Sequence, residues 1–321
     1  MLPHNSVVTV FGGSGFIGTQ IVQVLARRGY RVRVAVRRPD LAGHVRMLGG
    51  VGQVMPIQAN IRNLESVQRA VKGAGTVINL VGIGYEGGKQ RFRAVHTMGA
   101  RNVAEASRQA GVRTLVHMSA LGADPQSASN YARTKGLGEA EVQAAFKDAI
   151  IIRPSIIFGQ GDTFFNRLGA MARYLPVLPV IGAKARVQPI YVGDVAAAFF
   201  AAVEGKVKAG RIYEIGGPET ATQLELIKRV VAETQRSNLV VPVPAGLGKL
   251  LALPFAFLPF APLLTSDQVD LLQADNVVSD DARKDKRTLA AFGVTPTAMD
   301  AILESYLWRF MKNGQFDRQT A

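Results

Sequence analysis

The chain contains no cysteine among its 321 residues. Disulfide bridges and thiolate metal sites are therefore excluded, and the absence suits a reducing compartment. The four histidines (His4, His44, His96 and His117) also lack the short spacings that bind zinc. We therefore expect no metal site.

Acidic residues are scarce, because 24 Asp and Glu face 38 Lys and Arg and leave a formal net charge of +14. Such an excess favours an anionic partner, which could be nucleic acid, an anionic membrane surface or an acidic protein. The basic residues are scattered, with groups at 27–46 and 89–113, and no helix-turn-helix or zinc-finger pattern accompanies them. Charge without an element that reads bases is weak evidence, so we expect no nucleic-acid partner.

A long uninterrupted apolar run is missing too. No charged residue occurs between Lys249 and Asp267, but three prolines interrupt that stretch. A membrane-spanning helix needs about 20 consecutive apolar residues, so we expect no span here. The apolar, proline-rich segment 242–265 predicts one of two structures: a core helix and loop over a substrate cleft, or an apolar surface that docks on a membrane protein or the bilayer interface. The net charge favours the second.

The first forty residues carry the clearest pattern. Residues 7–11 are apolar and β-branched, which predicts a buried strand, and residues 30–36 alternate arginine with valine and alanine, which predicts a second strand. Between them lie Gly12, Gly15 and Gly18, followed by apolar residues at helical spacing. In a strand–turn–helix unit, such glycines allow a sharp turn, close approach of a pyrophosphate and close helix packing. The anion is then bound by the free N–H groups of the helix.

Arg37 and Arg38 stand at the end of the second predicted strand, where a dinucleotide site reads the adenosine ribose. An acidic residue there selects NAD, whereas arginine accommodates the 2′-phosphate of NADP. The first acid is Asp40, so the sequence favours NADP(H) over NAD(H). The alternative is that both arginines are solvated surface charge.

Further strands are predicted at 54–58, 76–82, 114–119 and 149–159, separated by helical segments. We therefore expect an α/β fold with a Rossmann doubly wound parallel sheet in residues 1–160, also taking in about 186–218. Residues 161–185 and 219–321 should form a smaller C-terminal α/β substrate-type subdomain. The charged run at 279–287 predicts a solvated loop.

Four motifs resemble the extended short-chain dehydrogenase/reductase superfamily, which includes the nucleotide-sugar epimerases. They are the glycine motif at 12–18, Tyr131-x-x-x-Lys135, RPSIIFG at 153–159 and YVGDV at 191–195. The longer runs around them resemble the atypical branch that holds the NADPH-binding accessory subunit of respiratory complex I. That resemblance covers about residues 7–312. Only six residues precede the first strand, so we expect no targeting segment and a bacterial form.

The resemblance implies roles for particular residues. In catalytic members Tyr131 would transfer a proton, Lys135 would lower its pKa and hold the nicotinamide ribose, and Ser119 would polarise the substrate carbonyl. The alternative, which the absence of their catalytic partners favours, is that Tyr131 and Lys135 serve as binding residues alone. The implied cofactor-binding residues are Gly12, Ser14, Gly15, Phe16, Ile17, Gly18, Arg37, Arg38, Asn60, Ile61, Leu80, Val81, Gly82, Tyr131, Lys135, Pro154, Ser155 and Ile156.

Two positions depart from the catalytic pattern. His96 stands where the enzymes carry asparagine, and Ala120 stands where they carry the polarising serine, so Ser119 falls one residue short. A missing donor of this kind weakens transition-state stabilisation. The resemblance thus favours an NADP(H)-binding accessory subunit of complex I, peripheral on the cytoplasmic side of the inner membrane, with the nucleotide bound mainly for stability. The alternative is an NADP-dependent reductase or nucleotide-sugar epimerase/dehydratase.

Overall fold

The computed structural model describes residues 6–252, 265–314 and 316. The chain forms two compact units. The first comprises Met1–Pro154, Gly193–Ile215 and Ser279–Thr295, and the second comprises Ser155–Val192, Gly216–Val278 and Pro296–Ala321. No helix in the described part of the chain is long and apolar enough to cross a membrane.

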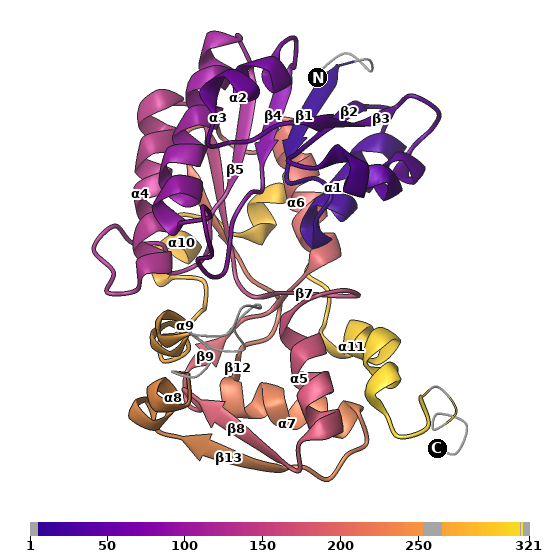
Figure 1. The fold of residues 1–321 in the computed structure, drawn as a ribbon, viewed down its shortest axis with the longest axis vertical. Helices are drawn as coiled ribbons and strands as arrows, with labels where there is room; N and C mark the ends of the chain where they lie inside the picture. Colours follow the sequence, from indigo (N-terminus) through magenta and orange to yellow (C-terminus); the bar gives the residue numbers. More distant parts are fainter. Residues whose placement is uncertain (1–5, 253–264, 315, 317–321) are drawn as a thin grey trace. The chain divides into compact units, whose positions relative to one another are not determined.

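The first unit is built on a parallel sheet of seven strands in the order β11-β6-β5-β4-β1-β2-β3 (Figure 1). Every pairing in it is parallel, which confirms the predicted Rossmann fold class. The order reverses between β1 and β4, so the carboxyl ends of these two strands flank the crevice where such sheets bind ligands. The strands are β1 Val7–Phe11, β2 Arg31–Val36, β3 Val54–Gln58, β4 Thr76–Asn79, β5 Thr114–Met118, β6 Ile150–Pro154 and β11 Ile212–Ile215.

Helices cover both faces of this sheet (Figure 1). On one face α2, α3 and α4 pack on the strands through a buried cluster that includes Val67, Val103, Val142 and Ile151. Each such side chain contributes roughly 1.5–3 kcal/mol on burial. On the other face lie α1 and α6. These helices are α1 Phe16–Arg27, α2 Leu64–Val71, α3 Met98–Gln109, α4 Asn130–Ala145 and α6 Val192–Val203.

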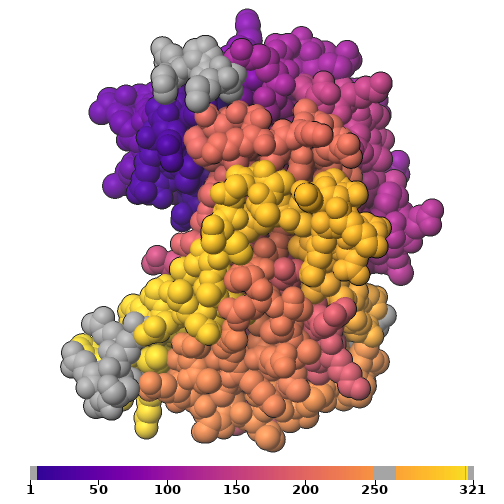
Figure 2. Space-filling view, turned by 180° about the vertical axis from the view of Figure 1, so that it is seen from behind, coloured from indigo at the N-terminus to yellow at the C-terminus, as the bar shows by residue number. Residues whose placement is uncertain are grey.

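The outer edge of β11 is covered by residues 279–295, which the sequence analysis placed in the smaller subdomain. Glu214 N donates to Arg287 O at 2.9 Å, and the rings of Tyr213 and Phe292 meet edge to face with centroids 5.0 Å apart. These non-local contacts attach the segment to the first unit, on whose surface Figure 2 shows it in golden yellow.

The predicted loop at 279–287 is wrong, because Asp280–Lys284 form a short helix, α10. The Ser279 side chain accepts the N–H of Ala282 and caps the helix. Acidic residues occupy its first turn and basic residues its last, which complements the helix dipole. The charges that made this run look solvated therefore also stabilise a helix.

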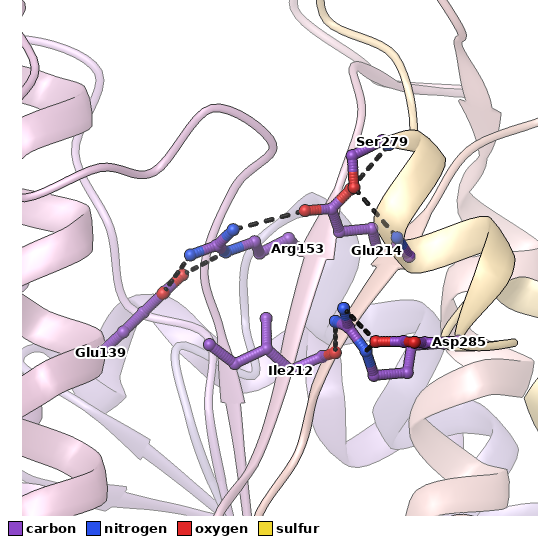
Figure 3. A network of polar contacts seen from close by, with 8 residues as sticks. Glu139, Arg153, Ile212, Glu214, Ser279 and Asp285 are labelled. Carbon is purple, nitrogen blue, oxygen red and sulfur yellow. Dashed lines mark hydrogen bonds and ion pairs between the residues drawn. The ribbon is translucent and has the colours of Figure 1, made fainter.

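A buried ion network joins α4 to the sheet (Figure 3). Arg153 on β6 donates to both carboxylate oxygens of Glu139 on α4, at 2.8 and 2.7 Å. Its third bond, at 3.3 Å, reaches Glu214 on β11, which also accepts the N–H of Ser279 at 2.8 Å. Removing one partner of a buried pair strands the other charge and costs about 3–5 kcal/mol. This network therefore fixes α4, which carries Tyr131 and Lys135.

The second unit contains short two-stranded sheets and helices around two small cores. Its strands β8 Val177–Ile181 and β13 Leu239–Val243 pair in parallel, a pairing that the sequence analysis did not predict. The other elements are β7 Ile157–Phe158, α5 Phe164–Tyr174, β9 Arg186–Val187, β10 Ile190–Tyr191, β12 Ala221–Thr222, α7 Gln223–Glu233, α8 Ala245–Ala252, α9 Ser266–Leu271 and α11 Asp300–Leu307.

The apolar segment 242–265 begins in β13 and continues into α8, whose bounds are Ala245–Ala252. Residues 253–264, half of the segment, lie outside the described residues. Whether the segment docks on a membrane or a protein therefore stays a prediction.

Candidate dinucleotide site

The glycine loop follows β1 directly and leads into α1. Gly12 has φ +80°, a conformation that favours glycine, and its N–H donates to Ala35 O at 3.2 Å. A Cβ on Gly18 would clash with Gly12 O and lie 2.6 Å from Gly13 Cα. A Cβ on Gly15 would meet only Gly12 O, at 3.5 Å. Gly18 is therefore required by the fold itself, whereas the space at Gly15 is open.

The amino end of α1 is prepared for an anion. Gly15 is its N-cap residue and has no side chain to satisfy the first N–H groups. No acidic residue stands in the first turn. Unsatisfied N–H groups and the helix dipole together favour a bound anion here. The residues present therefore fit the pyrophosphate of a dinucleotide, with Ser14, Phe16 and Ile17 in the same turn.

The loop after β4, which contains the implied cofactor-binding residues Leu80, Val81 and Gly82, lies next to the glycine loop. Leu80 N donates to Phe11 O at 3.0 Å, and Val81 N donates to Asn79 Oδ1 at 3.2 Å. A Cβ on Gly12 would lie 3.4 Å from Val81 Cγ2. The two loops therefore lie side by side at the carboxyl edge of the sheet.

Two predicted residues follow β3. Asn60 Oδ1 accepts the N–H of Arg62 at 3.2 Å and shapes the loop. Ile61 is buried in the core cluster, and its carbonyl accepts the Asn102 side chain at 2.8 Å. Ile61 thus packs this loop against α3, in addition to any ligand contact.

Arg37 and Arg38 are both exposed at the end of β2. Arg38 lies 3.6 Å from Asp40, in an exposed pair of the kind that contributes little. His44, in the helical segment η1 (Pro39–Leu48), lies with Nε2 3.3 Å from Ser14 O. Sequence reasoning missed this contact with the glycine loop, because no spacing rule connects the two positions.

Tyr131 and Lys135 lie on α4, and both are affected by burial. Lys135 Nζ donates to Met118 O at 2.8 Å, and burial lowers the pKa of its ammonium to about 8, while the charge of Glu139 opposes that shift. Burial raises the pKa of the Tyr131 phenol to about 12. Its ring meets the rings of Phe92 and His96 edge to face.

His96 joins the loop after β4 to α4. It lies in a π-helical turn, Arg93–Thr97, and is 2% exposed. Ile83 N donates to His96 Nε2 at 3.0 Å, so the neutral ring carries its proton on Nδ1, 3.1 Å from Thr134 Oγ1. Burial, aided by the positive charge of Lys135, lowers the His96 pKa to about 3. We call this arrangement the His96 bridge.

Ser119 follows β5 and has a buried hydroxyl. Its N–H donates to Ile152 O at 2.7 Å, but its Oγ has no hydrogen-bond partner among the described residues. A buried hydroxyl without a partner costs free energy, which a ligand's polar group would recover.

Pro154 ends β6 in the first unit, whereas Ser155 and Ile156 belong to the second, where Ser155 Oγ bonds Asn276 Oδ1 at 2.7 Å.

Comparisons with known proteins agree with this geometry. Residues 8–216 match the NAD dependent epimerase/dehydratase family. Subunit 9 of the NADH dehydrogenase [ubiquinone] 1 alpha subcomplex from Mus musculus is 34% identical over 297 residues, which cover 92% of this chain and 78% of that protein. The ceramide reductase of Caulobacter vibrioides is 39% identical over 191 residues, or 60% of this chain and 59% of that enzyme.

The fold is shared with solved structures of low sequence identity. The crystal structure of gox2253 has a TM-score of 0.72 at 20% identity and covers 97% of this chain and 99% of its own. MoeE5 in complex with UDP-glucuronic acid and NAD has a TM-score of 0.70 at 19% identity, covering 98% and 100%. With its glycine loop, its parallel sheet and this family match, the chain belongs to the NAD dependent epimerase/dehydratase family of extended short-chain dehydrogenases/reductases.

Proposed function

We propose that this chain is an NADP(H)-binding accessory subunit of respiratory complex I, in which the nucleotide stabilises the fold. The observation that carries the proposal is the similarity to complex I subunits along almost the whole chain. It extends over 92% of the chain for the mouse protein and 96% for the 40 kDa subunit of Neurospora crassa. The similarity to ceramide reductase ends at 60%.

The proposed nucleotide would be held by the crevice between β1 and β4. The N–H groups of α1 would bind the pyrophosphate above Gly15, and the loop at 80–82 would lie against the dinucleotide. Arg37 and Arg38 would meet the 2′-phosphate, because no acid stands at the end of β2. A bound nicotinamide supplies hydride chemistry. A ligand present at about 1,000 times its Kd adds about 4 kcal/mol to the stability of the fold.

Two features favour binding over turnover. With a pKa of about 12, Tyr131 remains protonated at neutral pH and is a poor base. The His96 bridge occupies the position where the family's enzymes carry the asparagine of a proton relay, and both of its ring nitrogens are used in hydrogen bonds. His96 holds the loop after β4 against α4 through Ile83 and Thr134. On α4, Lys135 Nζ donates to Met118 O.

Affinity capture tests the proposed partner. A tagged full-length chain, expressed in its own host and captured from mildly solubilised membranes, should bring down other complex I subunits. This result would also support the proposed site on the cytoplasmic side of the membrane if protease added to right-side-out vesicles leaves the chain intact. Capture of the chain alone, from the soluble fraction, would contradict the proposal.

The second candidate is an NADP-dependent reductase or nucleotide-sugar epimerase/dehydratase, favoured by the Tyr131–Lys135 pair and the partial similarity to ceramide reductase. If the accessory role is right, Tyr131→Phe should leave complex assembly intact and weaken NADPH binding by only about 2- to 10-fold, because a lost hydroxyl contact is worth about 0.5–1.5 kcal/mol. Turnover of a carbonyl or nucleotide-sugar substrate that disappears in this variant would instead establish the enzyme.

A further inference from the structure

A basic pocket lies in the first unit, away from the glycine loop. It has a volume of about 470 Å³ and is formed by the loop before β11, by β11 and by the turn after α10. Arg211 precedes the first residue of β11, so the pocket lies at the amino end of that strand. In a parallel sheet, this end is opposite the carboxyl edge that binds the dinucleotide. The lining residues are Lys206, Val207, Lys208, Arg211, Tyr213, Asp285, Lys286, Arg287 and Ala291.

The pocket holds five cationic side chains and one carboxylate. The carboxylate of Asp285 is engaged by Arg287, whose Nε lies 3.1 Å and Nη2 3.0 Å from Oδ2. Arg287 also donates to Ile212 O at 2.8 Å, which fixes it as part of the wall. The other four cations, Lys206, Lys208, Arg211 and Lys286, are exposed and form no ion pair within the described part of the chain.

Lys286 adopts a backbone conformation that is unfavourable for lysine. Its φ is +54°, and Gln235 is the one other non-glycine residue with positive φ in the described chain. Lys286 N donates to Arg283 O and Arg287 N to Ala282 O, the hydrogen bonds of a helix end at which glycine is usual. A lysine here keeps a strained backbone and adds a cation to the pocket. Strain of this kind often marks a functional position.

Tyr213 is the one aromatic residue among the described residues that line the pocket. Its hydroxyl donates to Lys208 O at 3.0 Å, which holds the basic loop in place. The positive charges of Arg211 and Arg287 both act on this phenol and oppose the rise in pKa that burial causes. Arg211 and Arg287 thus line the same pocket as this phenol from different segments of the chain.

We propose that this pocket binds a phosphomonoester or diphosphate group, at a site separate from the dinucleotide. Four cations are left unpaired in the part of the chain that the structure describes, because Arg287 already engages the single carboxylate, and guanidinium and ammonium groups are the usual phosphate ligands. The volume lies within the range of small-molecule sites, about 300–1,000 Å³. The phosphate can belong to a free small molecule or to a phospholipid headgroup, since both offer the same chemistry.

The test uses the full-length protein saturated with NADPH, so that the glycine loop is occupied. Inorganic pyrophosphate is titrated by calorimetry, and vesicles of phosphatidylcholine with or without phosphatidic acid are tested by co-sedimentation. Arg211→Gln should lower the affinity for whichever probe binds by about tenfold, as expected for loss of one charged hydrogen bond. Lys228→Gln, which removes an exposed lysine of the second unit, should leave the affinity for both probes unchanged.

A matched pair of variants separates binding from folding. Lys286→Gly and Gln235→Gly each relieve a positive φ at a helix end, so each should raise Tm by about 2 °C. Only Lys286→Gly should also lower the affinity for the probe. Pyrophosphate binding lost in Arg211→Gln assigns a free phosphate, and phosphatidic-acid sedimentation lost in that variant assigns a headgroup. Binding of neither probe, or equal binding by the natural chain and Arg211→Gln, overturns the proposal.

Discussion

Gly15→Ala is expected to weaken NADPH binding by about 10- to 100-fold while the unliganded protein stays almost as stable as the natural chain. The new Cβ would meet only Gly12 O at 3.5 Å, and the backbone at Gly15, with φ −81° and ψ 177°, suits alanine. An N-cap alanine costs about 1 kcal/mol or less relative to glycine. In the holo protein, however, that Cβ lies where the pyrophosphate must approach the backbone.

Gly18→Ala is the matched control, because it adds the same methyl group three residues later. Here the Cβ would clash with Gly12 O and lie 2.6 Å from Gly13 Cα, so the backbone must move. We expect the unliganded protein to lose about 3 kcal/mol, within the range found for strained or overpacked sites. Urea unfolding with and without NADPH or NADH measures both effects and the cofactor preference together. Undiminished NADPH affinity in Gly15→Ala would contradict the proposed site.

His96→Gln is expected to make the protein less sensitive to acid. The pKa of His96 is about 3 in the folded chain, against an ordinary 6.5. Between these values the unfolded chain binds a proton that the folded chain does not, so stability falls as the pH drops from 6.5 towards 3. The full shift corresponds to about 5 kcal/mol. Glutamine does not titrate, and its amide can both accept from Ile83 and donate to Thr134.

Urea midpoints at pH 7, 6, 5 and 4 measure this effect. The natural chain should lose stability steadily over this range, and His96→Gln should lose less, although it starts lower because it lacks the ring packed against Phe92 and Tyr131. Part of the acid sensitivity should remain, because burial also holds the pKa of His117 well below its ordinary value. His44→Gln controls for the loss of an exposed histidine. Parallel pH profiles for the natural chain and His96→Gln would rule out the His96 bridge as an acid-sensitive element.

Local signals in the sequence predicted the sheet and the glycine loop. A continuous β-branched run defines β1, alternation of arginine with valine and alanine defines β2, and glycine spacing defines the turn between them, so neighbours along the chain suffice. The contacts that complete the site are non-local. His96 reaches Thr134 across 38 residues, and Arg153 reaches Glu214 across 61. No periodicity in the sequence predicts such pairs.

The same distinction accounts for the differences in the rest of the fold. The high density of charge at 279–287 indicated a solvated loop. The N-cap Ser279 and the order of the charges, acidic first and basic last, instead stabilise the helix α10. Residues 279–295 join the first unit through Arg287 and Phe292, which find β11 only after the chain has folded. Likewise β8 and β13 pair across about 60 residues of sequence, and each strand alone gives a weak signal.

The nucleotide content of the captured complex tests the central claim most directly. Complex I would be purified through the tagged chain, allowed to oxidise NADH with a quinone acceptor, and then denatured to release bound nucleotide for mass spectrometry. We predict about one NADPH per copy of the chain, unchanged in amount and redox state by turnover. Natural-sequence complex that contains no NADP(H), or NADPH that turnover oxidises, would contradict the claim that the nucleotide is held to stabilise the subunit.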